Sequence, residues 1–267
     1  MRPLGVIGHL ARDVIADGPP RIGGGPWHAG RALRALQRDA LLAVKCGEDD
    51  RACFRRRLAG LGLPTTIASG GETTSFSFVY APDGRREMRV DAIGEPWRAE
   101  DAAERTLRRA EWIHVSPLLR GDLTPDTLER LARGRRLLLD GQGLVRPRRT
   151  GPLVLDGDFD LELLCHVSIL KLADEEARAI VGDADLEELR ALGVPEILVT
   201  FGLQGSLVLA RGASERVRAH PVDGDPTGAG DAFAAAYLTG RSAGHAPVSA
   251  ARQATALVAS LLSRQAR

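Results

Sequence analysis

The chain has 267 residues and a formal net charge of +1, from 36 basic and 35 acidic side chains, and 44% of its residues are hydrophobic. This composition excludes the disordered and fibrous classes, and the length can bury a substantial core in one large α/β domain or two small ones. The balanced, well-mixed charges give no reason to expect a nucleic acid partner, and no apolar stretch approaches the roughly 18 residues of a membrane span.

The three cysteines are the next constraint. Cys46, Cys53 and Cys165 have neither the C-x-x-C spacing of a metal or redox site nor a second metal-binding pair. Reduced thiols in the cytoplasm explain them best. We therefore expect a cytoplasmic protein that binds neither nucleic acid nor membranes.

Short apolar runs alternate with helical patterns along the whole chain. The predicted strands are residues 4–8, 41–47, 112–115, 137–140, 169–172, 197–200 and 207–209. The predicted helices are residues 29–36, 49–61, 99–110, 125–132, 174–181, 186–192 and 250–262. Continuous apolar strands separated by helices indicate a mostly parallel sheet covered on both faces, with ligands at the carboxyl ends of its strands.

Two features follow the first predicted strand. Asp13 alone would be interpreted as a solvated loop acid. Residues 23–30, Gly-Gly-Gly-Pro-Trp-His-Ala-Gly, then open a helix, and Gly23 and Gly24 would let a ligand lie against bare backbone. The alternative is a flexible turn before a helix with proline in its first turn. His28 on this helix is either a buried structural residue or a donor to a substrate.

Residues 74–93 have the pattern of a β-hairpin. Polar and aromatic residues alternate before an Asp-Gly pair, and a second strand-like run follows it. Phe76, Phe78 and Tyr80 should share one face of this hairpin. That face either covers a ligand or a partner, or it folds onto its own core.

Polar and glycine residues lie at or after the end of the predicted strand at 137–140, where α/β sheets contact their ligands. They include Asp140, Gln142 and Arg146. The acids at 174–176 also suit the first turn of a helix, where the helix dipole favours negative charge. On their own, residues 200–206 are interpreted as a turn between two strands.

Residues 225–231, Asp-Pro-Thr-Gly-Ala-Gly-Asp, run directly into helix-favouring residues. The small residues 228–230 let backbone N–H groups approach an anion at a helix N-terminus. We take Asp231 as the first residue of this helix. A carboxylate beside a phosphate would repel it, so Asp231 is better explained as a base that accepts the proton of an attacking hydroxyl. The alternative is an N-capping aspartate after a flexible loop.

The motif Asp-Pro-Thr-Gly-Ala-Gly-Asp-Ala-Phe at 225–233 resembles the C-terminal signature of the ribokinase-like carbohydrate kinases, the phosphofructokinase-B superfamily. The resemblance spans nearly the whole chain. It implies an α/β fold with a doubly wound, mostly parallel sheet flanked by helices and a small β-sheet lid from strands near 10–22 and 73–94. Residues 1–267 would form a single kinase domain. Lids in this family often pair between subunits, so the lid is a candidate homodimer surface.

The resemblance also implies a role for individual residues. The catalytic residues would be Asp231 with Gly228, Ala229 and Gly230. The acceptor-binding residues would be Asp13, Gly23, Gly24, His28, Asp140, Gln142 and Arg146. The ATP-binding residues would be Lys171, Thr200, Gly202, Gly205 and Thr227. Glu176 would organise Mg²⁺ through water, and Asp225 is a candidate contact for a monovalent cation such as K⁺.

The chain departs from the family pattern at two positions. His28 and Ala173 each stand where an asparagine is usual, which alters the acceptor site and the magnesium segment. The Asp-Gly-Gln-Gly sequence at 140–143 is similar to that of inositol- and nucleoside-type kinases. The resemblance thus implies an ATP-dependent kinase of a small sugar or polyol, inositol-like compounds included. A nucleoside kinase and a catalytically silent metabolite-binding homologue are the alternatives.

Overall fold

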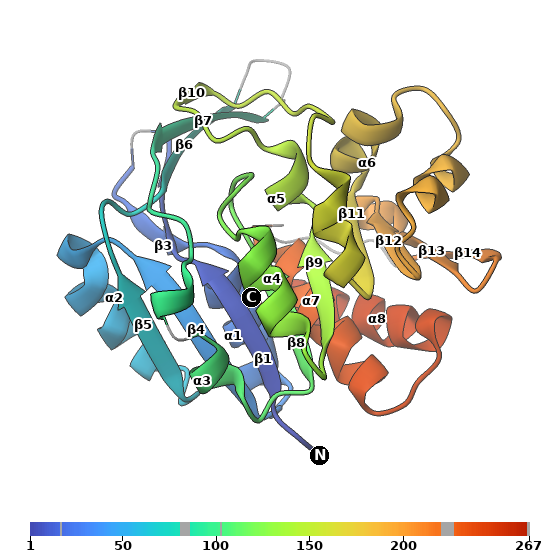
Figure 1. Ribbon diagram of the computed structural model, residues 1–267, viewed down its shortest axis with the longest axis horizontal. Helices are drawn as coiled ribbons and strands as arrows, with labels where there is room; N and C mark the ends of the chain where they lie inside the picture. Colours follow the sequence, from blue (N-terminus) through green and yellow to red (C-terminus); the bar gives the residue numbers. More distant parts are fainter. Residues whose placement is uncertain (17, 81–85, 102, 220–226, 266–267) are drawn as a thin grey trace.

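The computed structural model describes residues 1–16, 18–80, 86–101, 103–219 and 227–265 (Figure 1). Within these residues the chain forms a sheet of nine strands and a second sheet of five. Figure 1 shows the smaller sheet at the end of the larger one where the parallel strands finish. No helix in the described ranges is long and apolar enough to cross a membrane.

The larger sheet is mostly parallel, as predicted. In spatial order its strands are β14 (Ala213–Val217), β13 (Ser206–Ala210), β12 (Glu196–Thr200), β11 (Ile169–Ala173), β9 (Arg136–Asp140), β8 (Trp112–Ser116), β1 (Leu4–His9), β4 (Ala40–Cys46) and β5 (Thr65–Ser69). Among the described residues, the antiparallel pairings in this sheet are β12 with β13 and β13 with β14. The carboxyl ends of the parallel strands therefore meet along one edge of the sheet.

The smaller sheet contains the predicted hairpin. Its order is β10 (Gly151–Pro152), β7 (Arg86–Ala92), β6 (Ser75–Tyr80), β2 (Ala11–Ile15) and β3 (Arg21–Gly23). Strands β6 and β7 are antiparallel, as the alternating pattern predicts. The Asp-Gly turn between them lies outside the described residues. The sequence did not predict β10, whose two residues are too few to give an alternating pattern.

Helices cover both faces of the larger sheet. One face carries α1 (Gly25–Ala35), α2 (Glu48–Ala59), α7 (Ala229–Ser242) and α8 (Pro247–Gln265). The other carries α3 (Ala103–Leu107), α4 (Pro125–Ala132), α5 (Gln142–Val145) and α6 (Asp174–Val181). Two predicted helices differ in detail, because residues 186–192 are a 3₁₀-helix and residues 99–110 contain a 3₁₀ turn before the short α3.

Each face of the sheet has its own hydrophobic core. Along β9, Leu138 packs with the helices α1, α7 and α8, whereas Leu137 and Leu139 pack on the opposite side. Side chains alternate along a strand, so a run that is apolar at every position must be covered on both faces. The continuous apolar strands of the sequence therefore correspond to this three-layered arrangement.

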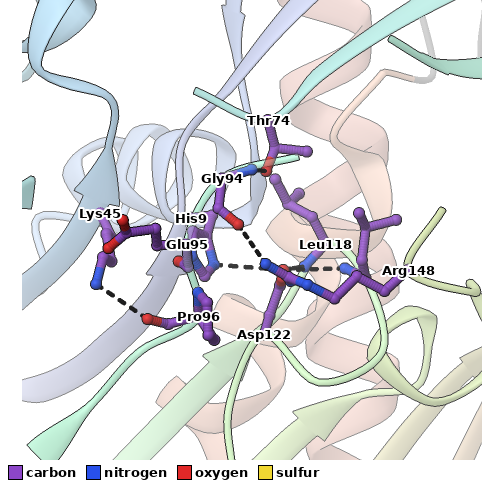
Figure 2. A network of polar contacts seen from close by, with 10 residues as sticks. His9, Lys45, Thr74, Gly94, Glu95, Pro96, Leu118, Asp122 and Arg148 are labelled. Atoms are coloured by element: carbon purple, nitrogen blue, oxygen red, sulfur yellow. Dashed lines mark hydrogen bonds and ion pairs between the residues drawn. The ribbon is translucent and has the colours of Figure 1, made fainter. Parts of the chain in front are cut away.

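A buried carboxylate stabilises the loop after β8 (Figure 2). Asp122 accepts hydrogen bonds from the backbone N–H groups of Leu118 and Leu119, at 2.8 and 3.0 Å. It pairs with Arg148, and His9 Nδ1 lies 3.3 Å from it. Burial opposes ionisation of Asp122, but His9 and the backbone N–H groups outweigh that cost and lower its pKa.

The same network reaches the smaller sheet (Figure 2). Arg148 also donates to the carbonyl oxygen of Gly94, whose own N–H donates to Thr74 Oγ1 at 2.9 Å. On the other side, His9 Nε2 lies 2.8 Å from the carbonyl oxygen of Glu95. These bonds hold the two segments that enter and leave the hairpin against the end of β1.

Candidate active site

The first turn of α7 is built from residues without large side chains. Helix α7 begins at Ala229 after the N-cap Gly228. The prediction that Asp231 is the first residue of this helix is therefore wrong, because Asp231 is the third. Gly228 has a φ of 77°, a left-handed conformation that favours glycine. A Cβ atom here would lie 2.1 Å from His28 Nδ1, so the turn packs directly against α1.

The carboxylate of Asp231 lies at the N-termini of two helices. Ser116 at the end of β8 donates a hydrogen bond to Asp231 Oδ1 at 3.3 Å. A Cβ atom on Gly25, the first residue of α1, would lie 2.5 Å from the same oxygen and 1.6 Å from Ser116 Oγ. Only glycine leaves room for this approach. The positive ends of both helix dipoles favour a charged carboxylate at this place.

Asp231 faces a cavity of about 150 Å³ between the smaller sheet and the first turns of α1 and α7. Most of the predicted acceptor residues line it, together with part of the segment 225–231 that was predicted to bind an anion, which we call the anion loop. These lining residues are Asp13, Gly24, His28, Gln142, Arg146, Thr227, Gly228 and Asp231. The structure thus brings together residues from four distant parts of the sequence, and we call this space the acceptor cavity.

The smaller sheet closes one side of the acceptor cavity. Phe76 and Phe78 lie in its wall with Met88 and Leu118. Both phenylalanines are also buried in a small core with Leu119. Phe76 and Phe78 therefore pack on their own core, the second of the two interpretations, and they also border the cavity. The side chain of Tyr80 lies outside the described residues.

Gly23 and Asp140 occupy different places from the other predicted acceptor residues. A Cβ atom on Gly23 would lie 2.0 Å from Asp13 Oδ2, so this glycine makes room for the Asp13 carboxylate. Asp140 does not line the acceptor cavity. It is buried beneath the cavity, and both of its oxygens have partners inside the protein.

Asp140 is the centre of a buried charged network. Lys171 Nζ donates to its Oδ1 at 2.7 Å, and His114 Nε2 lies 2.7 Å from its Oδ2. Burial raises the cost of ionising Asp140, but the Lys171 ammonium and His114 outweigh it and lower its pKa below the ordinary range. These groups come from three neighbouring strands, β8, β9 and β11.

Lys171 brings a positive charge under the first turn of α7. A Cβ atom on Gly230 would lie 2.9 Å from Lys171 Nζ. Burial favours the neutral amine, but Asp140 and then Glu176 outweigh this effect and raise the pKa of Lys171. The ammonium and the free N–H groups of the helix therefore favour an anion at the same place.

Glu176 is a buried acid at the start of α6. Its Oε2 accepts a hydrogen bond from the Ala173 N–H at 2.9 Å, which is half of a capping box, since alanine offers no acceptor in return. Burial raises the pKa of Glu176, partly offset by Lys171 and Arg146. Its Oε1, 3.8 Å from Arg146, makes no hydrogen bond within the described ranges. This free oxygen fits a water molecule of a hydrated magnesium ion.

The group of His114, Asp140 and Asp231 also has potential metal ligands within 4.8 Å of one another. It suits a cation poorly. Both oxygens of Asp140 are already engaged, and the Lys171 ammonium that donates to one of them would repel a metal ion. We therefore interpret this group as part of the buried network.

A second cavity, of about 110 Å³, lies on the other side of α7. The predicted ATP-side residues Thr200, Gly202 and Gly205 line it, and so do Ala229 and Gly230 from the anion loop. The rest of its wall is mainly apolar, from Leu203, Phe233, Val258 and Leu262. We call it the donor cavity. The first turn of α7 thus forms a wall of both cavities.

The sequence did not predict three residues that shape the site: His114, Ser116 and Gly25. The first two are polar residues within or at the end of an apolar strand, and that was the available signal. Gly25 is part of the run Gly23–Gly25, and the sequence did not indicate a separate role for it. Asp225, the candidate cation contact, lies outside the described residues.

Comparison with known proteins gives consistent matches. A model of the pfkB family carbohydrate kinases matches residues 21–266. The chain is similar to the cytidine kinase of Thermococcus kodakarensis, with 29% identity over 261 residues that cover 91% of this chain and 90% of that protein. It is similar to the inositol 3-kinase of Oryza sativa subsp. japonica, with 30% identity over 257 residues that cover 88% of this chain and 62% of the rice protein.

The fold is also similar to a solved structure. A pyrophosphate-dependent kinase in the ribokinase family, complexed with a pyrophosphate analog and myo-inositol, superimposes with a TM-score of 0.82. The two sequences are 26% identical, and the match covers 97% of this chain and 94% of the other. Both sheets of the present chain therefore lie within the region of similarity.

Proposed function

The chain belongs to the pfkB family of carbohydrate kinases, and from this premise we propose that it transfers the γ-phosphoryl group of ATP to a hydroxyl of a small sugar or polyol. It is a small-molecule kinase with the ribokinase-like fold that the sequence predicted. The observation that carries the proposal is the position of α7. The first turn of α7 lines both the acceptor cavity and the donor cavity, so a phosphoryl group bound at this turn lies between the two cavities.

Asp231 is the base in this proposal. Its carboxylate faces the acceptor cavity, where it would accept the proton of the attacking hydroxyl as the new P–O bond forms. Ser116 holds the carboxylate in place through its hydrogen bond. An aspartate that only capped the helix would not need to face a cavity.

The anion loop supplies the charge stabilisation. The backbone N–H groups at 228–230 lie at the helix N-terminus and would donate to the oxygens of the transferred phosphoryl group. Lys171, held beneath this turn by Asp140, adds a positive charge that needs no rearrangement during the reaction. Thr227 precedes the turn and lines the acceptor cavity.

Two metal ions enter the proposal at different places. Mg²⁺, when bound with the nucleotide, neutralises charge on its phosphate oxygens. Glu176 would hold one of the waters of this ion through its free Oε1. A K⁺ contact at Asp225 stays a prediction from the resemblance.

The donor cavity favours a nucleotide. Its wall combines glycines with apolar side chains such as Leu203 and Val258, which suit the flat, apolar faces of an adenine ring. Pyrophosphate has no such apolar part and would leave this surface without a ligand. It is nevertheless the phosphoryl donor named for the similar structure, so it is the direct competitor to test.

The acceptor cavity suits a polyhydroxylated molecule. Asp13, His28, Gln142 and Arg146 offer donors and acceptors, and Arg146 Nε is buried without a hydrogen-bond partner among the described residues. A nucleoside is the second candidate acceptor, since one relative is named a cytidine kinase and another an inositol 3-kinase. The aromatic wall of Phe76 and Phe78 would accommodate its base.

A screen of donors and acceptors tests the proposal. Purified protein would be incubated with ATP or pyrophosphate, Mg²⁺, and each of a panel of sugars, polyols and nucleosides, and ADP or phosphate release would be measured. We expect acceptor-dependent ADP release with ATP. If phosphate is released with pyrophosphate but ADP is not released with ATP, the choice of ATP as donor is contradicted. If neither donor is consumed with any acceptor, the result favours the catalytically silent homologue.

Three further expectations accompany the proposal. We propose that the smaller sheet acts as a lid, and that residues 1–267 form one kinase domain. The lid is also the proposed surface for a homodimer, which light scattering would test by mass. The cytoplasmic location rests on the cysteines, and Cys46, Cys53 and Cys165 are free in the structure.

A further inference from the structure

A larger cavity, of about 720 Å³, adjoins the acceptor cavity. The two share three wall residues: Asp13, His28 and Thr227. The remaining walls come from β2 and β3 of the smaller sheet and from α1 and α2. A molecule whose hydroxyl lies near Asp231 could therefore extend into this second space.

Arginines dominate the charged side chains of this larger cavity. Among the described residues, its wall contains Arg12, Arg21, Arg31 and Arg57 but only two acids, Asp13 and Asp50. The whole chain, in contrast, has almost equal numbers of basic and acidic residues. Positive charge is thus concentrated beside the acceptor cavity, where like charges repel one another unless an anion binds.

Three of these arginines have no ion-pair partner among the described residues. Arg12 is neutralised by Asp50, whose carboxylate lies 2.6 Å from its guanidinium. Within the described parts of the chain, Arg21, Arg31 and Arg57 make no ion pair or side-chain hydrogen bond. All three are exposed residues that line the cavity, so they are available to a ligand.

The local structure directs two of them toward the acceptor. Arg21 on β3 pairs directly with Asp13 on β2, so both side chains lie on the same face of the smaller sheet. Arg31 follows His28 by three residues on α1, which places the two side chains on the same face of the helix. Each arginine is therefore next to a residue that also lines the acceptor cavity.

We propose that the acceptor is a phosphorylated sugar or polyol whose phosphate group is bound by Arg21, Arg31 and Arg57. This inference rests on the proposed function and narrows its substrate class. A guanidinium offers paired donors that match phosphate oxygens, and a dianionic phosphate balances several cations better than a single carboxylate does. The hydroxyl to be phosphorylated is the one at the opposite end of the molecule, toward Asp231.

The test compares matched pairs of ligands by calorimetry, without turnover. The probes are myo-inositol against myo-inositol 1-phosphate and ribose against ribose 5-phosphate, at near-physiological salt and with a non-hydrolysable ATP analogue present to occupy the donor cavity. We expect each phosphate ester to bind at least about 10-fold more tightly than its parent compound, as charge-assisted hydrogen bonds predict. Gluconate is a third probe, and equally tight binding of this carboxylate would overturn the assignment to phosphate.

Arginine variants locate the site. Arg21→Ala and Arg31→Ala should each weaken binding of the phosphate esters by about 10-fold and leave the neutral parents unchanged. Arg56→Ala is the matched control, because Arg56 is an exposed arginine on α2 that lies outside this cavity. An equal loss in the control would show a general effect of surface charge and overturn the proposal.

The outcomes also separate this inference from the proposed function. Phosphoryl transfer to neutral acceptors without any preference for phosphate esters would overturn the inference and leave the kinase function intact. Tight, Arg21-dependent binding of a phosphate ester without transfer to any acceptor would support the anion site and contradict the kinase function.

Discussion

Replacing Lys171 by methionine should reveal the energy of the buried charged network. Met has a similar length but no ammonium, so Asp140 Oδ1 loses its donor at 2.7 Å while the carboxylate stays fully enclosed. Breaking a buried ion pair by removing one partner costs about 3–5 kcal/mol, because an uncompensated charge remains. We therefore expect Lys171→Met to lower the free energy of unfolding at pH 7 by about this amount.

The destabilisation by Lys171→Met should depend on pH, because it depends on the charge of Asp140. In the wild-type protein the pKa of Asp140 is lowered, so its stabilising contribution is complete above the unfolded pKa of ~3.9 and is lost as the pH falls through the lower folded value. Without Lys171, burial dominates and the folded pKa of Asp140 rises. The destabilisation of the variant should then shrink as the pH falls from 7 toward 4.

Urea unfolding at pH 7 and pH 5 provides the assay. Arg133→Met is the matched control, since it removes an exposed ion pair with Glu129 on α4 and should cost at most about 0.5 kcal/mol. If Lys171→Met alone does not fold, adding Asp140→Asn should restore folding by removing the unpaired charge. A cost below about 1 kcal/mol, or the same cost at both pH values, would refute our interpretation of the network.

Three further predictions concern the site and its support. Gly25→Ala should reduce turnover strongly with little change in the fold, because the new Cβ would displace Ser116 Oγ and Asp231; unchanged turnover would contradict the geometry. Glu176→Gln should raise the Mg²⁺ concentration for half-maximal rate more than it changes the KM of the acceptor, whereas a role limited to the start of α6 would leave the magnesium dependence unchanged. Asp122→Asn should lower the free energy of unfolding by about 3–5 kcal/mol at pH 7 and speed hydrogen exchange in β6. The pKa of Asp122 is lowered in the folded protein, so the stabilisation by its carboxylate in the wild type should disappear as acidification protonates it.

Much of the fold follows from local sequence patterns. Continuous apolar runs predicted the central strands, because each must be buried on both faces, and the alternating residues 74–93 predicted the β6–β7 hairpin. The glycines before Asp231 indicated a helix N-terminus open to an anion. The edge strand β5, with its sequence Thr-Thr-Ile-Ala-Ser, was missed because it is not a continuous apolar run.

The fine structure of the site depends on contacts that are distant in sequence. Asp140 looked like a ligand contact because it ends a strand, but Lys171 and His114 on the neighbouring strands engage both of its oxygens. Likewise, the need for glycine at position 25, the start of α1, comes from Ser116 at the end of β8. A single sequence does not state which side chains such strand pairing brings together.

The most direct test of the account is turnover by Asp231→Asn. Asparagine keeps the size of the side chain and remains a good residue near a helix N-terminus, but it cannot accept the proton of the acceptor hydroxyl. With an acceptor identified by the donor and acceptor screen, we predict that turnover falls by about 10²–10⁴-fold while acceptor and ATP binding and the melting temperature stay close to those of the wild type. Near-normal turnover in this variant would contradict the assignment of Asp231 as the catalytic base.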